Sequence, residues 1–210
     1  MGMGMTRLEI EIIVEEQSAG EALRHLLPKV IKSRGRAKII NMGSKSKMLK
    51  FLPSRLAAYR QRLNSGEQLR IIVLVDRDND DCEELKGRLE RMAGDAGLST
   101  KTSPDNKGHF LVLNRVAVEE LESWFIGDPA ALRKAFTSLP KIDIAKSIFR
   151  NPDNGGSWEA LHRFFKKHGI YKSGFQKIDA ARRIAPHMEV AVNRSRSFQA
   201  FISGIEAMLT

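Results

Sequence analysis

Three groups of acidic residues each follow a stretch of sequence that has the composition of a buried β-strand. The acids are Glu15 after residues 8–14, Asp76 and Asp78 after residues 69–75, and Glu119, Glu120 and Glu122 after residues 110–113. In an open parallel sheet, ligands bind beyond the carboxyl ends of the strands, so we expect these side chains to meet at one edge. Carboxylate oxygens suit Mg²⁺ or Mn²⁺, and a carboxylate can also move a proton.

The alternative interpretation is that these acids only cap helices or form a solvated rim. An Asp after a strand often caps the next helix and stabilises it by about 1 kcal/mol. Asp80 or Asp81 can fill that role here, which leaves the two preceding aspartates without it. Two carboxylates about 4 Å apart repel by roughly 4 kcal/mol at an effective dielectric constant of about 20. A divalent cation would remove that repulsion, and Arg77 or Arg115 could instead neutralise part of it, so both interpretations stay open.

The elements that must position these acids follow an alternating pattern. Apolar runs predict strands over 8–14, 37–42, 69–75 and 110–113, and helical spacing of apolar residues separates them. After residue 128 only helices are predicted, over 129–137, 157–168, 174–185 and 195–209. The pattern predicts an α/β fold with an open, mostly parallel four-stranded sheet flanked by helices and an α-helical C-terminal extension. We expect one α/β domain over 1–128 and a helical extension over 129–210 packed on it.

Several predicted helices begin with a recognisable capping residue. Ser18 and Glu21 have the spacing of a capping box, with the serine at the N-cap and the glutamate three positions later. Asp128 precedes Pro129, a combination that favours a helix start. Ser157 is the expected cap of the helix that follows it.

The charge distribution favours binding to polyanions. The 210-residue chain has 35 Lys and Arg against 25 Asp and Glu, a formal net charge of +10. Residues 29–70 contain twelve bases and one acid, and residues 133–210 contain fourteen bases and six acids. The candidates for contact with nucleic acid are Lys45, Lys47, Lys50, Arg194 and Arg196. Ser195 and Ser197 beside the last two could bind an anion at a helix start or act as an ordinary N-cap.

The composition also excludes several classes of protein. A hydrophobic fraction of 42% and a charged fraction of 29% exclude wholesale disorder. Cys82 is the one cysteine, so an intrachain disulfide and a cysteine-based zinc site are excluded. The apolar runs are too short to span a bilayer, and the first residues lack the pattern of a secretory signal. We expect a cytoplasmic protein that makes no contact with membranes.

Four segments of the chain carry a resemblance to a known superfamily. They are residues 13–18, 74–78, 118–124 with Asp128, and 193–198. The chain resembles the Toprim domain of topoisomerases, primases and OLD-type nucleases, and more closely an uncharacterised Toprim-like bacterial family, domain of unknown function 4276. The resemblance implies that Glu15 is a general acid/base or a metal ligand, that Asp76 and Asp78 bind the metal, and that one of Glu119, Glu120 and Glu122 supplies a further acid. The chain differs from the Toprim pattern at Glu16, where glycine is usual.

The resemblance and the acids together lead to one functional expectation and two alternatives. We expect a Mg²⁺- or Mn²⁺-dependent nuclease or other phosphodiester-cleaving protein, working with a separate ATPase chain in phage defence. The first alternative is a non-catalytic Toprim-like module that binds nucleic acid or an ATPase. The second is a phosphatase or phosphotransferase that acts on small molecules. The chain has no Walker A pattern of its own, so any ATP dependence would come from another chain. The five histidines are scattered, and none is expected to be a ligand.

Overall fold

A computed structural model describes residues 7–117, 121–142, 144–145, 147–154 and 156–210. Its first half alternates strands and helices: β1 (Glu9–Val14), α1 (Gln17–Ile31), β2 (Arg36–Asn41), α2 (Lys45–Asn64), β3 (Leu69–Asp76), α3 (Cys82–Asp95) and β4 (Val112–Ala117). The strands form one sheet in the order β2-β1-β3-β4, and every neighbouring pair is parallel. The predicted fold class is therefore confirmed, and the sheet is wholly parallel.

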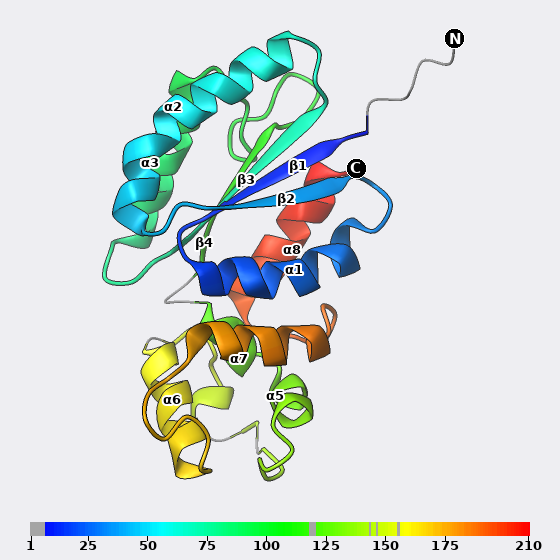
Figure 1. Ribbon diagram of the computed structural model, residues 1–210. Helices are drawn as coiled ribbons and strands as arrows, with labels where there is room; N and C mark the ends of the chain where they lie inside the picture. Colours follow the sequence, from blue (N-terminus) through cyan, green and yellow to red (C-terminus); the bar gives the residue numbers. More distant parts are fainter. Residues whose placement is uncertain (1–6, 118–120, 143, 146, 155) are drawn as a thin grey trace.

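Helices cover both faces of the sheet, as the continuous apolar character of the central strands requires. Helices α2 and α3 pack on one face, where Ile13 and Val73 lie in the same buried cluster as Leu56 and Leu89. Helix α1 and the last helix, α8 (Arg196–Met208), cover the opposite face (Figure 1). Strands β1 and β3 are thus buried on both sides, which fixes the position of the residues that follow them.

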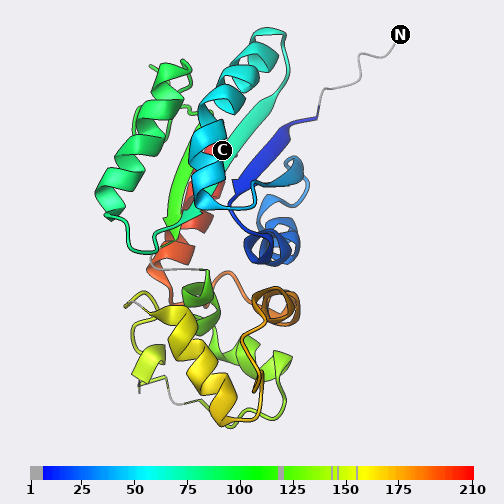
Figure 2. The same ribbon diagram turned by 60° about the vertical axis from the view of Figure 1, so that its left-hand side comes forward.

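The remaining helices form a second layer beyond the sheet, seen below it in Figures 1 and 2. They are α4 (Glu122–Ile126), α5 (Pro129–Ala135), α6 (Ser157–Lys167) and α7 (Lys177–Ile184), with 3₁₀ turns at Ser147–Phe149 and Ala185–His187. Helix α7 and the 3₁₀ turn after it pack on α1. Lys29 Nζ of α1 donates to the carbonyl oxygens of Pro186 in that turn at 2.8 Å and of Met188 just after it at 2.7 Å. One apolar cluster runs from the sheet through α8 into this layer, so the two parts share a core.

The fourth strand begins and ends further along the chain than the sequence predicted, and it is longer, because its polar residues have hydrogen-bond partners. The apolar run over 110–113 predicted the strand, but β4 extends to Ala117. Asn114 is buried, and its Nδ2 donates to Glu90 Oε1 on α3 at 3.1 Å. Arg115 Nε donates to a backbone carbonyl of α8 at 3.0 Å. These two side chains therefore continue the strand instead of ending it.

The predicted capping box of α1 is wrong, because the helix begins one residue earlier than Ser18. Glu16 occupies the N-cap position, and Ser18 Oγ donates to Glu16 Oε1 at 2.9 Å. Glu21 is drawn instead into an ion pair with Arg182 of α7 at 3.0 Å. A tertiary contact, which the local sequence does not reveal, has taken the residue that the motif assigned to the cap.

Of the other predicted helix caps, the structure confirms two aspartates and not Ser157. Asp128 Oδ1 accepts from Ala131 N at 3.0 Å, and Asp81 Oδ1 accepts from the first amides of α3, so both aspartates cap as expected. Ser157 does not cap α6, because Gly156 takes the N-cap position with φ of 59°. Glycine adopts this left-handed conformation at little cost. No described helix is long and apolar enough to cross a membrane.

Candidate functional site

The carboxyl edge of the sheet gathers acids from three segments of the chain. Glu15 follows β1, Asp76 is the last residue of β3 and lies opposite Ala117 of β4, and Glu122 begins α4. All three side chains are buried, with residue exposures of 7%, 5% and 0%. The predicted convergence of acids on one edge is what parallel strands of this order produce. Of the acidic run 119–122, only Glu122 is placed, because Glu119 and Glu120 lie outside the described residues.

The electrostatics of this edge penalise its charged form. Burial, with the charge of Asp78, raises the pKa of Glu15 to about 7. Burial, followed by the charges of Glu15 and Glu122, raises the pKa of Asp76 well above its ordinary value. Glu15 Oε2 is buried and has no hydrogen-bond partner among the described residues. A buried carboxylate oxygen without a partner is costly, and the cost is relieved either by a proton, which the raised pKa favours, or by a bound cation.

Two lysines partly neutralise the acids. Lys45 Nζ lies 2.6 Å from Asp78 Oδ2 and 2.9 Å from Asp80 Oδ2, and it also donates to the carbonyl of Arg77. Burial opposes its charge, but the hydrogen bonds to these aspartates raise the pKa of Lys45 overall. Lys45, predicted as a nucleic-acid contact, is therefore part of the acidic edge itself.

The second lysine comes from the helical layer. Lys177 Nζ lies 3.6 Å from Glu16 Oε1 and 3.8 Å from Glu122 Oε1. Sequence reasoning missed this residue, although one signal was present. Lys177 and Lys45 are each the first residue of a helix, where the helix dipole disfavours a positive charge. Nearby carboxylates explain both exceptions.

The two aspartates after β3 have different surroundings. Asp76 is buried, whereas the side chain of Asp78 is 48% exposed and pairs with Lys45. Asp78 also has φ of 48°, a left-handed conformation that aspartate tolerates better than most residues. Glu16, where the expected Toprim pattern calls for glycine, has φ of −130° and ψ of 164°. That backbone is ordinary extended structure, so a glutamate is accommodated there without strain.

The acids at this edge have the right chemistry for a divalent cation but are not preassembled around one. Among the described residues, no three His, Cys, Asp or Glu side chains stand in a metal-holding arrangement. The donors are nonetheless the hard carboxylate oxygens that Mg²⁺ and Mn²⁺ prefer. When all are ionised, the six carboxylates of this edge exceed the two ammonium groups by four charges; they are Glu15, Glu16, Asp76, Asp78, Asp80 and Glu122. The residues fit a cation by donor type and charge, and they would have to turn to coordinate it.

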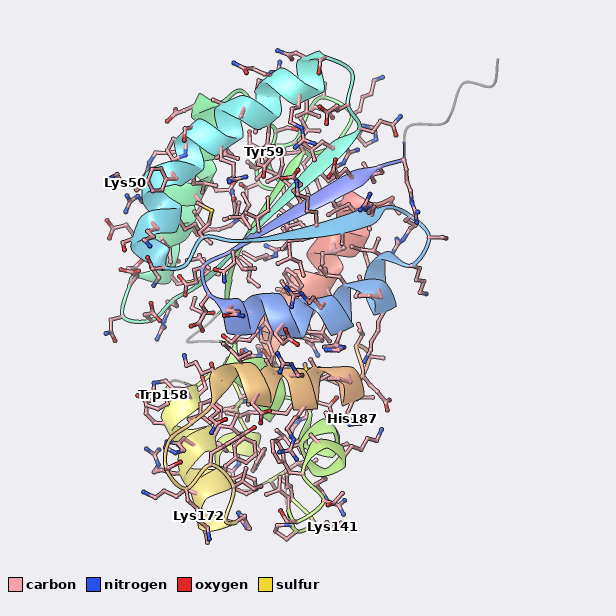
Figure 3. All side chains as sticks on the ribbon, in the orientation of Figure 1. Lys50, Tyr59, Lys141, Trp158, Lys172 and His187 are labelled. Atoms are coloured by element: carbon pink, nitrogen blue, oxygen red, sulfur yellow. The ribbon has the colours of Figure 1, made fainter. Side chains whose placement is uncertain are left out.

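The other predicted nucleic-acid contacts lie in two separate places. Lys47 and Lys50 are exposed on α2, and Figure 3 shows Lys50 on that helix. Arg194 and Arg196 are exposed at the start of α8, on either side of buried Ser195. The structure therefore does not bring these four cations together, and their binding role stays a prediction.

The segment Asn193–Phe198 has a positioning role that sequence reasoning missed. Asn193 Nδ2 donates to the carbonyl of Trp124 at 2.7 Å, and its Oδ1 accepts from Ser195 N at 2.9 Å. Trp124 Nε1 donates to Ser197 Oγ at 3.0 Å. These bonds hold α4, whose first residue is Glu122. Ser195 also caps α8 by accepting from Phe198 N at 3.1 Å, so the N-cap interpretation is confirmed.

The Asn193–Phe198 segment lies so close to the end of α4 that only glycine fits at position 127. A Cβ on Gly127 would lie 2.8 Å from Ser195 N, which is too close for any other residue without a backbone shift. A glycine directly before the Asp128 cap was therefore the available signal that another segment approaches α4 closely.

A comparison with protein families accounts for most of the chain. A family model described as a domain of unknown function (DUF4276) matches residues 14–206. The matched range contains the acids of the strand ends, both lysines of the edge and the Asn193–Phe198 segment. Searches of curated proteins and of solved structures gave no match.

Proposed function

The chain belongs to the family described as domain of unknown function DUF4276, and we propose that it is a Mg²⁺- or Mn²⁺-dependent enzyme that cleaves phosphodiester bonds in nucleic acid. The observation that carries the proposal is the burial of Glu15, Asp76 and Glu122 together at one sheet edge. Gathering like charges away from water destabilises a fold, and it is explained if a bound cation compensates for the cost in the working enzyme.

Each acid has a separate task in this mechanism. Asp76 and Glu122 would hold the metal ion from the buried side, and Asp78 would reach it from the exposed side. The bound ion would polarise a phosphoryl oxygen and lower the pKa of a water molecule. Glu15, with a pKa of about 7, is suited to take a proton from the attacking water near neutral pH and return it later.

The charge of the remaining surface supports a polyanionic substrate. The chain carries a net charge of +10, and Lys47, Lys50, Arg194 and Arg196 expose their cations. Cations that neutralise backbone phosphates give affinity without sequence preference. A small phosphoester would have no need of cations so widely spread. Within the same proposal, a separate ATPase chain supplies any ATP dependence, as the Toprim-like resemblance to ATPase–nuclease defence pairs implies.

A second candidate function is a non-catalytic module that binds nucleic acid or an ATPase. The contacts of Lys45 and Lys177 favour it, because they already offset part of the acidic charge without a metal ion. The absence of a preassembled ligand set among the described residues points the same way. The two functions differ in one respect that is directly measurable, namely metal-dependent turnover.

The test is a cleavage assay with single-stranded DNA, duplex DNA and RNA, each with Mg²⁺, Mn²⁺ or EDTA. We expect metal-dependent cleavage by the wild type and a loss of at least about 100-fold in Asp76→Asn. Asp95→Asn, which changes an exposed acid at the end of α3, is the matched control and should cleave normally. Nucleic-acid binding by the wild type without cleavage of any substrate would favour the non-catalytic module.

A further inference from the structure

Three arginines line a single surface pocket in the helical layer. Arg150 directly precedes residues 151–154, and Arg194 and Arg196 flank the N-cap of α8. Together with Asn151 and Asn154 they surround a pocket of about 400 Å³. Forty or more positions of the chain separate the residues around Arg150 from Arg194 and Arg196, so the fold brings the three arginines to one pocket.

Carboxylates do not neutralise the pocket arginines. None of the three guanidinium groups forms an ion pair with a residue in the described part of the chain. The acid in the lining is Asp153, and donors from the N-cap and first turn of α8 occupy both of its oxygens. Oδ1 accepts from Ser195 Oγ at 2.7 Å and Ser197 Oγ at 2.8 Å, and Oδ2 accepts from Arg196 N at 2.7 Å. The pocket therefore keeps two positive charges in excess.

Two of the guanidinium groups are held in place by neutral acceptors. Arg194 Nη1 donates to the carbonyl of Phe149 at 2.9 Å, and Arg150 Nε donates to the carbonyl of Ala145 at 2.9 Å. A guanidinium has five N–H donors, so each group keeps most of its donors for a ligand. Holding an arginine before binding also reduces the entropy that a ligand must overcome.

We propose that this pocket is a binding site for a phosphate group, separate from the acidic edge. The planar fork of arginine matches the geometry of phosphate oxygens, and three forks around one cavity match a group with several such oxygens. Asn151 and Asn154, whose side-chain amides can also donate hydrogen bonds, are among the residues that line the pocket. The phosphate comes either from a nucleic-acid strand or from a free phosphate or mononucleotide. The inference extends the role proposed above for Arg194 and Arg196 to a defined pocket that includes Arg150, and it does not depend on cleavage.

The experiment measures binding of a short fluorescent single-stranded DNA to the full chain by anisotropy, in EDTA so that cleavage plays no part. Arg196→Gln is the first variant, because its guanidinium has no hydrogen-bond partner among the described residues. We expect it and Arg150→Gln to weaken binding by about tenfold and to lower the salt slope by about 1. Lys172→Gln removes an exposed cation elsewhere in the helical layer (Figure 3) and should change affinity less than about twofold.

Competition then identifies the source of the phosphate. The probes are inorganic phosphate, AMP, and the same DNA with and without a 5′-phosphate. Displacement by phosphate or AMP in wild type but not in Arg196→Gln supports a site for a free phosphate monoester. Weaker DNA binding in both arginine variants, without such displacement, supports a site for the nucleic-acid backbone. If both arginine variants bind DNA, phosphate and AMP like the Lys172→Gln control, the proposal is wrong.

Discussion

Two buried polar clusters in this protein differ in how completely their groups are partnered. In the Asn193–Phe198 segment, the side chains of Asn193 and Ser195 each bind a neighbouring segment and also accept from a backbone amide at the start of α8. At the acidic edge, carboxylates lie among carboxylates, and Glu15 Oε2 has no hydrogen-bond partner in the described chain. The first cluster stabilises the fold, whereas the second carries a cost that points to binding.

The two clusters also differ in how their charged groups are balanced. The segment before α8 offers amides and hydroxyls, and the Asp153 carboxylate fills the helix start from within the chain. The acidic edge draws on lysines at two helix starts, yet negative charge remains in excess. A helix start that an internal carboxylate already fills has little capacity left for an external anion, so the pocket arginines beside it are the better candidates.

The largest expected effect is on the satisfied cluster. Asn193→Ala leaves the carbonyl of Trp124 and the amide of Ser195 without their partner inside the core. We expect the free energy of unfolding to fall by about 3 kcal/mol, measured by urea denaturation. Ser203→Ala, an exposed hydroxyl on α8, is the control and should change it by less than about 0.5 kcal/mol. Equal effects of the two changes would remove the distinction between the clusters.

A substitution at the acidic edge should stabilise the protein, in contrast to Asn193→Ala, because Glu15 lacks a full set of partners. The pKa of Glu15 is about 7 in the folded protein against 4.5 for the free group. When folding raises the pKa of a group, the contribution of that group to the free energy of unfolding is fully present below its pKa in the unfolded chain. The contribution is lost as the pH rises through its pKa in the folded protein. Glu15→Gln should therefore stabilise the metal-free protein by on the order of 2 kcal/mol at about pH 8 and by little at about pH 5.

This prediction is checked by urea denaturation in EDTA across that pH range. The raised pKa of Asp76 contributes in the same direction, so the variant keeps part of the pH dependence. A variant that is less stable than wild type at the alkaline end would show that Glu15 is well partnered and that the edge is an ordinary structural cluster.

A smaller effect tests whether Lys177 offsets the acids. Its ammonium lies near Glu16 and Glu122, and its side chain is 32% exposed, so solvent screens the interaction. Lys177→Gln should lower the stability of the metal-free protein by about 1 kcal/mol. In a Glu122→Gln background the same change should cost less, and a double-mutant cycle measures the difference. Strict additivity would mean that the two side chains are energetically independent.

Much of the sheet and of its acidic edge could be predicted from the sequence. Continuous apolar runs fixed the strands, and parallel topology then required Glu15 and Asp76 to share an edge. The polar residues of β4, the recruitment of Glu21 by Arg182 and the return of α8 to the sheet depend on contacts between distant segments. Local patterns carry no information about such contacts. For the same reason Lys177 and Asn193 were missed, although a lysine at a helix start and a glycine before a cap marked both places.

The most direct test of a cation site at the acidic edge is calorimetric titration of the full chain with Mn²⁺. We expect the wild type and Asp95→Asn to release or absorb the same heat on binding. Asp76→Asn keeps the shape of the side chain but removes its charge, and it should lose most of that heat. Identical heats for wild type and Asp76→Asn, or no binding heat in the wild type, would contradict the proposal that these buried carboxylates hold a metal ion.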